Sequence, residues 1–270
     1  MMEFVTLNNG VEMPILGTGT NTFGKVDGDY FGEVTDDTTE LQSAIAAGYR
    51  AIDTAVAYRN ESTVGKAIKE SGLPREDFFI TSKIPGDLDH AGSAEKVEAT
   101  LNASLEALQT DYIDLYLIHH PWDNENEMLQ TWYALENAYN EGKIKAIGVS
   151  NFDQDQLDII IDNARIQPMV NQIKSNVEVW NDDIIEYSAE NDVVVTAWAP
   201  MKGTDEASRA ILGEIGAQYG KTWGQVLLRY QIERGVVVIP KSHNADHQAD
   251  NLNVFDFNLS DADKEKIASL

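Results

Sequence analysis

"YIDLYLIH" (residues 112–119) is a short, mostly apolar run that ends in a polar residue. Similar runs rich in Val and Ile recur along the chain at FFITSKI (78–84), AIGVSN (146–151), PMVNQI (168–173), VVVTAWAP (193–200) and GVVVIPKS (235–242). Continuous apolar runs of this length are typical of strands that are buried on both faces, as in a parallel sheet. The runs therefore predict buried parallel strands.

The stretches between the runs carry apolar residues at helical spacing, as in Val97, Leu101, Leu105 and Leu108, or in Met128, Trp132, Leu135 and Tyr139. Such stripes are typical of helices that pack on a core. Counting ILGTGT (15–20) and RAIDTA (50–55) as the first two strands gives eight strand-then-helix units. Eight such units in about 250 residues predict an α/β fold closed into a (β/α)₈ TIM barrel, with an open doubly wound sheet as the competitor.

The two ends of the chain add smaller elements to this barrel. The alternating stretch FVTLNNGVEMPIL (4–16) around Asn9-Gly10 predicts an N-terminal β-hairpin with a type I′ turn, which would plug the bottom of the barrel. The C-terminal segment after the last strand is short and ends with the helical stretch LSDADKEKIASL (259–270). No linker-like stretch divides the chain, so we expect one domain over residues 1–270.

Composition excludes several classes of function. The chain has 45 acidic and 20 basic residues, a net charge of −25, which disfavours nucleic acid and anionic membranes as partners. Zero cysteines exclude disulfides and thiolate metal sites, and the five scattered histidines form no zinc motif, so we expect no metal. The N-terminus has no signal-peptide pattern, and no apolar stretch approaches the roughly 18–20 residues of a membrane span. We expect a cytoplasmic protein.

Polar residues at the carboxyl ends of barrel strands face the active mouth in this fold. The candidates are Asp53, Lys83, His119, His120, Ser150, Asn151, Asn171, Gln172, Lys241 and Ser242. Each alone has a structural explanation, such as a helix cap or an ion pair. Because side chains alternate along a strand, only one of His119 and His120 is expected to face the mouth, and alternation does not say which.

Two of these candidates, Asp53 and Lys83, form a chemical unit together with Tyr58. A tyrosine that must give up a proton at neutral pH needs its pKa of ~10 lowered, which a nearby ammonium can do. A carboxylate keeps that ammonium charged and in place. Tyr58, Lys83 and Asp53 supply these three groups from adjacent units.

The order of the motifs resembles that of the aldo-keto reductases, in particular the bacterial 2,5-diketo-gluconate reductase-like members. The matching motifs are DTAVAYRNE (53–61), TSKI (81–84), LIHHP (117–121), IGVSNF (147–152), NQI (171–173) and IPKS (239–242). The resemblance implies reduction of aldehydes, ketones or dicarbonyls to alcohols, with a hydride from NAD(P)H. It implies Tyr58 as general acid, Lys83 as the cation beside it, Asp53 as the partner of Lys83, and His119 as the group that orients the carbonyl.

The resemblance also implies where the cofactor binds. The residues that it assigns to the dinucleotide are Thr20, Ser150, Asn151, Gln172, Trp198, Pro200, Lys241, Ser242, Asn244, His247, Asp250 and Asn251. GTGTNT (17–22) has only part of a dinucleotide fingerprint and opens no helix, so a Rossmann site is not expected. NADPH is the expected cofactor, but His247 stands where many NADPH-selective relatives carry arginine. A mostly neutral imidazole is a weaker phosphate ligand, which makes NADH use compatible with the sequence.

For the substrate, a small-molecule carbonyl compound, the resemblance implies a pocket walled by Asn21, Phe23, His120 and Trp180. His119 falls at the carbonyl, whereas His120 falls where many relatives have tryptophan and borders the pocket. Many relatives also add a C-terminal loop over the substrate; without it we expect an open pocket. We expect a monomer.

Two other functions stay open at this point. One is a Schiff-base lyase on the same barrel with Lys83 as the nucleophile, which borohydride trapping of Lys83 by substrate would support. The other is a nucleotide-binding regulatory or structural protein that keeps the fold without turnover. It would be favoured if the protein bound NADPH but oxidised none of it across a carbonyl panel.

Overall fold

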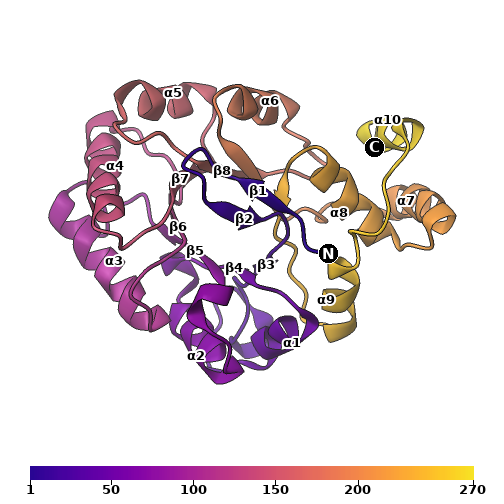
Figure 1. Ribbon diagram of the computed structural model, residues 1–270, viewed down its shortest axis with the longest axis horizontal. Coiled ribbons are helices and arrows are strands. Elements are labelled where there is room, and N and C mark those ends of the chain that lie inside the picture. The colour runs from indigo at the N-terminus through magenta and orange to yellow at the C-terminus, as the bar shows by residue number, and fades with distance from the viewer.

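The computed structural model describes residues 1–270 and contains a sheet of eight parallel strands whose spatial order follows the sequence. The strands are β3 (Thr18–Gly19), β4 (Ala51–Asp53), β5 (Phe79–Ile84), β6 (Leu115–Ile118), β7 (Ile147–Ser150), β8 (Val170–Lys174), β9 (Val194–Trp198) and β10 (Val237–Val238). A parallel bridge between Leu16 and Val238 joins the last strand to the first. The sheet therefore closes into a barrel, which confirms the predicted fold and excludes the open doubly wound sheet (Figure 1).

Helices surround the barrel and cover its outer face (Figure 1). They are α1 (Thr39–Ala47), α2 (Glu61–Ser71), α3 (Ala94–Leu108), α4 (Glu125–Asn140), α5 (Gln154–Asn163), α6 (Asp182–Glu190), α7 (Glu206–Tyr219), α8 (Trp223–Glu233), α9 (Ala245–Leu252) and α10 (Asp261–Ala268). The predicted stripes on α3 and α4 face the core, where most of their apolar side chains are buried. None of the helices is both long enough and apolar enough to cross a membrane.

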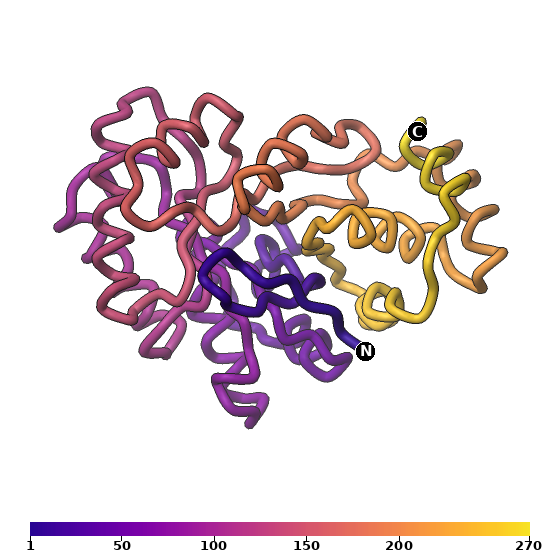
Figure 2. The backbone as a smooth tube through the Cα atoms, turned by 45° about the horizontal axis from the view of Figure 1, so that its top comes forward, coloured from indigo at the N-terminus to yellow at the C-terminus, as the bar shows by residue number.

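The main core lies inside the barrel and between the barrel and its helices. A second, smaller apolar cluster joins α7, α8 and α10 through residues such as Leu212, Leu227 and Ile267. Figure 2 shows the C-terminal segment running back along this side of the molecule to place α10 beside α7. Burial of the apolar side chain of Ile267 anchors α10 there.

The N-terminal hairpin, β1 (Phe4–Thr6) and β2 (Glu12–Pro14), lies across one end of the barrel (Figure 1). The predicted type I′ turn is wrong, because Gly10 has φ of +86° while Asn9 stays outside the left-handed region. Gly10 N donates to Leu7 O at 2.8 Å and Leu7 N donates to Val11 O at 2.9 Å, the pattern of a three-residue loop that ends in a left-handed glycine. The Asn9 side chain instead donates to Lys145 O at 2.9 Å, which ties the hairpin to the segment before β7.

Candidate active site

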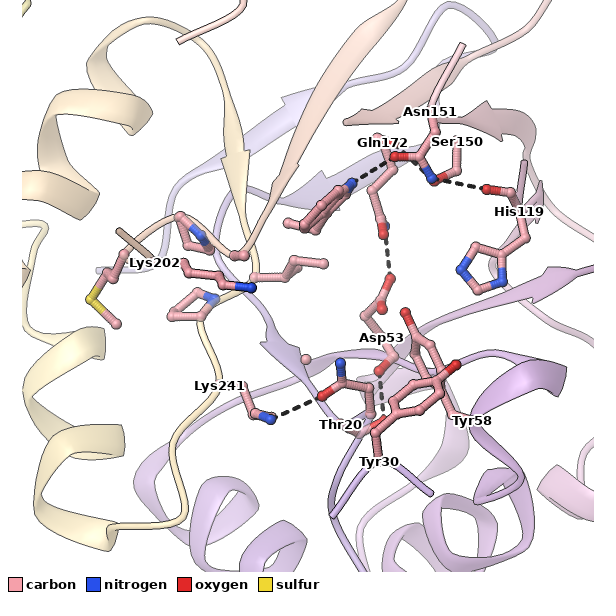
Figure 3. Close-up of a pocket in the computed structure, with 18 of the residues that line it drawn as sticks. Thr20, Tyr30, Asp53, Tyr58, His119, Ser150, Asn151, Gln172, Lys202 and Lys241 are labelled. Atoms are coloured by element: carbon pink, nitrogen blue, oxygen red, sulfur yellow. Dashed lines mark hydrogen bonds between the residues drawn. The ribbon is translucent and has the colours of Figure 1, made fainter. Parts of the chain in front are cut away.

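A cavity of about 590 Å³ opens at the carboxyl ends of the barrel strands (Figure 3). Its walls are formed by Gly19, Thr20, Asn21, Tyr30, Asp53, Tyr58, His119, His120, Ser150, Asn151, Gln172, Trp198–Lys202 and Ile239–Lys241. All four residues predicted to be catalytic are at or under this cavity, since Lys83 is buried directly beneath Tyr58 and Asp53. The mouth of the barrel is therefore the candidate active site.

A short turn after β4 presents Tyr58 to the cavity. Residues Val56–Tyr58 form one turn of 3₁₀ helix, and Arg59 then adopts a left-handed conformation with φ of +60°. The buried Asn60 side chain holds this turn, because it accepts from Thr54 Oγ1 at 2.9 Å and donates to Thr20 O at 2.7 Å. The backbone on both sides of Tyr58 is thus fixed by hydrogen bonds.

Lys83, on β5, connects the acidic and phenolic groups. Its Nζ atom donates to Asp53 Oδ1 at 2.6 Å, to Thr54 O at 3.0 Å and to the Tyr58 hydroxyl at 3.3 Å. The other carboxylate oxygen of Asp53 accepts from Gln172 Nε2 at 2.8 Å. The structure thus brings together the three groups that the sequence singled out, and it adds Gln172 as a second partner of the carboxylate.

The charge on Lys83 follows from these contacts. Burial alone would lower its pKa, but the Asp53 carboxylate, with a contribution from Tyr58, raises the pKa above its ordinary value. The lysine is therefore an ammonium at neutral pH. Burial raises the pKa of Tyr58, and the nearby Lys83 ammonium opposes this rise. The Lys83 ammonium lowers the pKa of Tyr58, as the sequence predicts, but the effect of burial is larger. The net pKa is raised, so the phenol is protonated at neutral pH.

The two histidines lie next to each other on the cavity wall. Strand β6 ends at Ile118, so the strand alternation that was expected to separate them does not apply, and both line the cavity. Their rings stack with centroids 4.5 Å apart, and the His119 ring lies edge-on to Tyr58 at 5.7 Å. Burial, with Lys83 and His120 adding to it, lowers the pKa of His119 to about 2. His119 is therefore a neutral imidazole that can donate or accept one hydrogen bond.

Next to the two histidines, the ends of β7, β8 and β9 contribute hydroxyl, amide and indole groups to the wall (Figure 3), and Asn151 Nδ2 donates to His119 O at 3.1 Å. Ser150 Oγ donates to Gln172 O at 2.8 Å, and Asn151, with φ of +62°, turns its side chain toward Trp198. Trp198 Nε1 donates to Asn151 Oδ1 at 2.9 Å, which fixes the indole against the cavity. The predicted residues Ser150, Asn151, Gln172 and Trp198 thus form one hydrogen-bonded wall, whereas Asn171 is buried and holds Phe152 O.

The far end of the cavity contains Lys241. Its Nζ atom donates to Thr22 Oγ1 at 2.7 Å and to Asn21 Oδ1 at 3.0 Å, and burial lowers its pKa. Of the other residues predicted there, Asn244 caps helix α9, and His247 and Asp250 are exposed on that helix. Pro200 lines the cavity, whereas Ser242 and Asn251 lie outside its lining.

Two predicted pocket residues do not reach the cavity. Phe23 is fully buried, and its ring packs edge-on against His243 with centroids 5.3 Å apart. Trp180 packs against Tyr230 at 5.1 Å, next to the smaller apolar cluster. The structure places Asn21 and His120 on the wall as predicted.

Three residues on the wall lie outside every stretch that the sequence analysis singled out. Tyr30 comes from the loop between β3 and α1, and Met201 and Lys202 follow β9. The adjacent aromatic residues Tyr30 and Phe31 in a polar, glycine-containing stretch are the signal that could have drawn attention to this loop.

Comparison with known proteins places this geometry in context. The model of the Aldo/keto reductase family matches residues 15–270. The glyoxal reductase of Bacillus subtilis is 40% identical over 270 residues, which cover 100% of this chain and 93% of that protein.

Solved structures give the same result. The crystal structure of an aldo/keto reductase from Brucella melitensis has a TM-score of 0.90 at 34% identity, covering 100% of this chain and 99% of that one. An aldo-keto reductase of the silkworm, Bombyx mori, solved in complex with NADPH, has a TM-score of 0.90 at 35% identity, covering 100% of this chain and 88% of that one.

Proposed function

The chain belongs to the aldo/keto reductase family, and from its site we propose that it reduces aldehydes, ketones or dicarbonyls to alcohols with NAD(P)H. The observation that carries the proposal is the buried Lys83 ammonium, which contacts both the Asp53 carboxylate and the Tyr58 hydroxyl at the floor of the cavity. The glyoxal reductase similar to this chain supports a carbonyl substrate. All these side chains come from one chain, and we propose residues 1–270 as one catalytic domain.

The residues of the cavity fit a dinucleotide. Lys202 and Lys241 line it and form no ion pair within the protein, in a chain whose net charge is −25. Cations that lack a carboxylate partner are suited to bind phosphate groups. Trp198 offers a flat apolar face, and Ser150 and Asn151 offer hydroxyl and amide groups beside it, which suits a nicotinamide ring and its carboxamide.

In this mechanism the nicotinamide supplies the hydride, and the protein supplies a proton and the orientation of the substrate. Tyr58 donates its hydroxyl proton to the carbonyl oxygen. The Lys83 ammonium, 3.3 Å from that hydroxyl, stabilises the phenolate that forms, and Asp53 keeps Lys83 charged. The neutral His119 ring next to Tyr58 donates a hydrogen bond to the carbonyl oxygen and so orients it.

The contacts of Lys83 disfavour the lyase alternative. A Schiff-base lysine must be a free, neutral amine, and it is usually activated by a lowered pKa. Lys83 instead has a raised pKa, and its three hydrogens all have acceptors within the protein, at Asp53, Thr54 and Tyr58.

For the cofactor we propose NADPH, the nucleotide bound to the silkworm neighbour, with NADH compatible because His247 offers an imidazole in place of a guanidinium. The test is steady-state kinetics with NADPH and NADH against methylglyoxal, diketo sugars, aromatic aldehydes and keto esters. We expect carbonyl-dependent oxidation of the nucleotide. Tight nucleotide binding without turnover on any carbonyl would contradict the proposal and favour a binding protein.

A further inference from the structure

The cavity has two parts with different linings. Every apolar side chain on its wall belongs to Trp198–Met201 or Ile239–Pro240, on the side of β9 and β10. Apart from Gly19, the rest of the lining consists of polar side chains, and it includes Tyr58 with Tyr30 and His119 beside it. A hydrocarbon or a large ring system placed against Tyr58 would cover these polar groups without pairing them, which costs free energy. This part of the cavity is therefore built for a small substrate with more than one polar atom.

Tyr30 brings a second phenol hydroxyl to this polar part. Its ring lies edge-on to the ring of Tyr58 with centroids 6.0 Å apart (Figure 3). Tyr30 is half-buried and lines the cavity. The two phenol rings therefore lie side by side on the cavity wall, so a ligand that reaches Tyr58 also lies next to Tyr30.

Two cations hold the backbone of Tyr30 in place. Lys25 Nζ donates to Tyr30 O at 2.6 Å and to Asn21 O at 2.9 Å, and it lies 4.7 Å from the Tyr30 ring centroid. Arg59, directly after Tyr58, donates from Nη2 to Tyr30 O at 3.0 Å and to Gly32 O at 3.1 Å. The loop that carries Tyr30 is thus tied to the turn that carries Tyr58.

The contacts of Lys25 connect a buried cation to the cavity wall. Lys25 is only 7% exposed and has no carboxylate within ion-pair distance. Burial, with the Arg59 cation adding to it, lowers the pKa of Lys25 to about 8, and the Asp29 carboxylate opposes this lowering. Its two carbonyl acceptors belong to Asn21 and Tyr30, both on the cavity wall. Lys25 therefore helps to shape the polar part of the cavity.

We infer that Tyr30 is a substrate-recognition residue whose hydroxyl binds a second oxygen of the substrate, on the carbon next to the carbonyl that Tyr58 protonates. The substrate class is then a small vicinal dicarbonyl or 2-hydroxy aldehyde. The inference rests on the proposed reductase function and adds to it the residue that selects the substrate. Lys25 and Arg59 are positioning residues that act through the backbone of Tyr30.

The test compares methylglyoxal with propanal, an aldehyde of the same chain length that lacks the second oxygen. Tyr30→Phe keeps the ring and removes the hydroxyl. We expect the ratio of kcat/KM for methylglyoxal to that for propanal to fall roughly tenfold, the size of one lost hydrogen bond to substrate, with propanal reduction little changed. Tyr133→Phe, on α4 and away from the cavity, is the matched control and should leave the ratio as in the wild type.

The outcomes separate this inference from the proposed function. If the wild type reduces both aldehydes and Tyr30→Phe leaves the ratio unchanged, or lowers both rates equally, Tyr30 does not recognise the second oxygen and the inference is overturned. If the wild type reduces neither aldehyde with either nucleotide, the reductase proposal fails and the inference fails with it. Fluorescence titration of NADPH with Tyr30→Phe shows that the variant is folded, because nucleotide binding should stay at the wild-type level.

Discussion

Replacing Asp53 by asparagine perturbs the buried charge at the floor of the cavity. The Lys83 side chain is 0% exposed and that of Asp53 is 5% exposed, with 2.6 Å between Nζ and Oδ1. Removing one partner of a buried ion pair costs roughly 3–5 kcal/mol, because the remaining charge is left without a counter-ion. Asparagine also has a single acceptor oxygen where the carboxylate accepts from both Lys83 and Gln172. We therefore expect Asp53→Asn to lose about 4 kcal/mol of unfolding free energy.

Urea unfolding at neutral pH measures this loss. The pKa of Lys83 in the folded chain lies above its ordinary value of 10.5. The contribution of its charge to the free energy of unfolding is therefore complete below pH 10.5 and is lost only as the pH rises through the raised pKa. In thermal unfolding the loss corresponds to a decrease in Tm on the order of 10 °C, since one kcal/mol shifts a chain of this size by roughly 2–4 °C.

A double-mutant cycle with Lys83→Met identifies the cause of the loss. Removing both charges should cost clearly less than the sum of the two single changes, with a coupling of about 2 kcal/mol or more. Additive losses, or an Asp53→Asn variant within about 1 kcal/mol of the wild type, would refute the account of a charged, mutually dependent pair.

Further predictions concern the nucleotide, the two histidines and the loop. His247→Arg should change the ratio of the Kd for NADH to the Kd for NADPH by roughly tenfold in favour of NADPH, because a guanidinium keeps its charge and can bind a phosphate with two hydrogen bonds. An unaltered ratio in fluorescence titrations would mean that the 2′-phosphate binds elsewhere. His119→Ala should lower kcat for every carbonyl in a panel, whereas His120→Ala should mainly change their relative kcat/KM; equal effects of both variants would contradict the separate roles. The pKa of Lys25 is lowered to about 8 from 10.5, so between these pH values the unfolded chain binds more protons than the folded chain. The free energy of unfolding of the wild type should therefore rise with pH in this range relative to that of Lys25→Met. Parallel pH profiles of the two proteins would contradict the lowered pKa.

The barrel was predictable because its strands and helices have strong local patterns. Each of the eight predicted runs coincides with a strand of the barrel, and only β8 extends beyond its run, by Lys174. The strands β3 and β10 are only two residues long. The barrel closes between them through a single parallel bridge from Val238 to Leu16, which lies just before β3. The hairpin was predictable too, but its turn type was not: Asn9 stays outside the left-handed region, and its side chain donates to the distant Lys145 O.

The four residues proposed to be catalytic could be grouped from the sequence because Asp53, Lys83 and His119 lie at or next to strand ends and Tyr58 lies on the turn after β4, and the topology brings these places together. The part of the cavity wall that was not predicted includes Tyr30, which lies in the loop between β3 and α1, a stretch without helical or strand periodicity. Phe23 is part of the main apolar core, and His243, which lies far away in the sequence, packs edge-on against its ring. Tyr30 reaches the cavity because Lys25 and Arg59 hold its carbonyl oxygen. The contacts of Phe23 with His243 and of Tyr30 with Arg59 join distant parts of the chain and leave no pattern in the local sequence.

The most direct test of the central claim is the turnover of Tyr58→Phe with methylglyoxal and NADPH, measured together with the Kd for NADPH. If Tyr58 donates the proton, kcat should fall by on the order of 10²–10⁴-fold while NADPH still binds as to the wild type, since general acid catalysis supplies that much of the rate. Turnover at the wild-type level in this variant would contradict the claim that the phenol above the Lys83–Asp53 pair is the acid of the reaction.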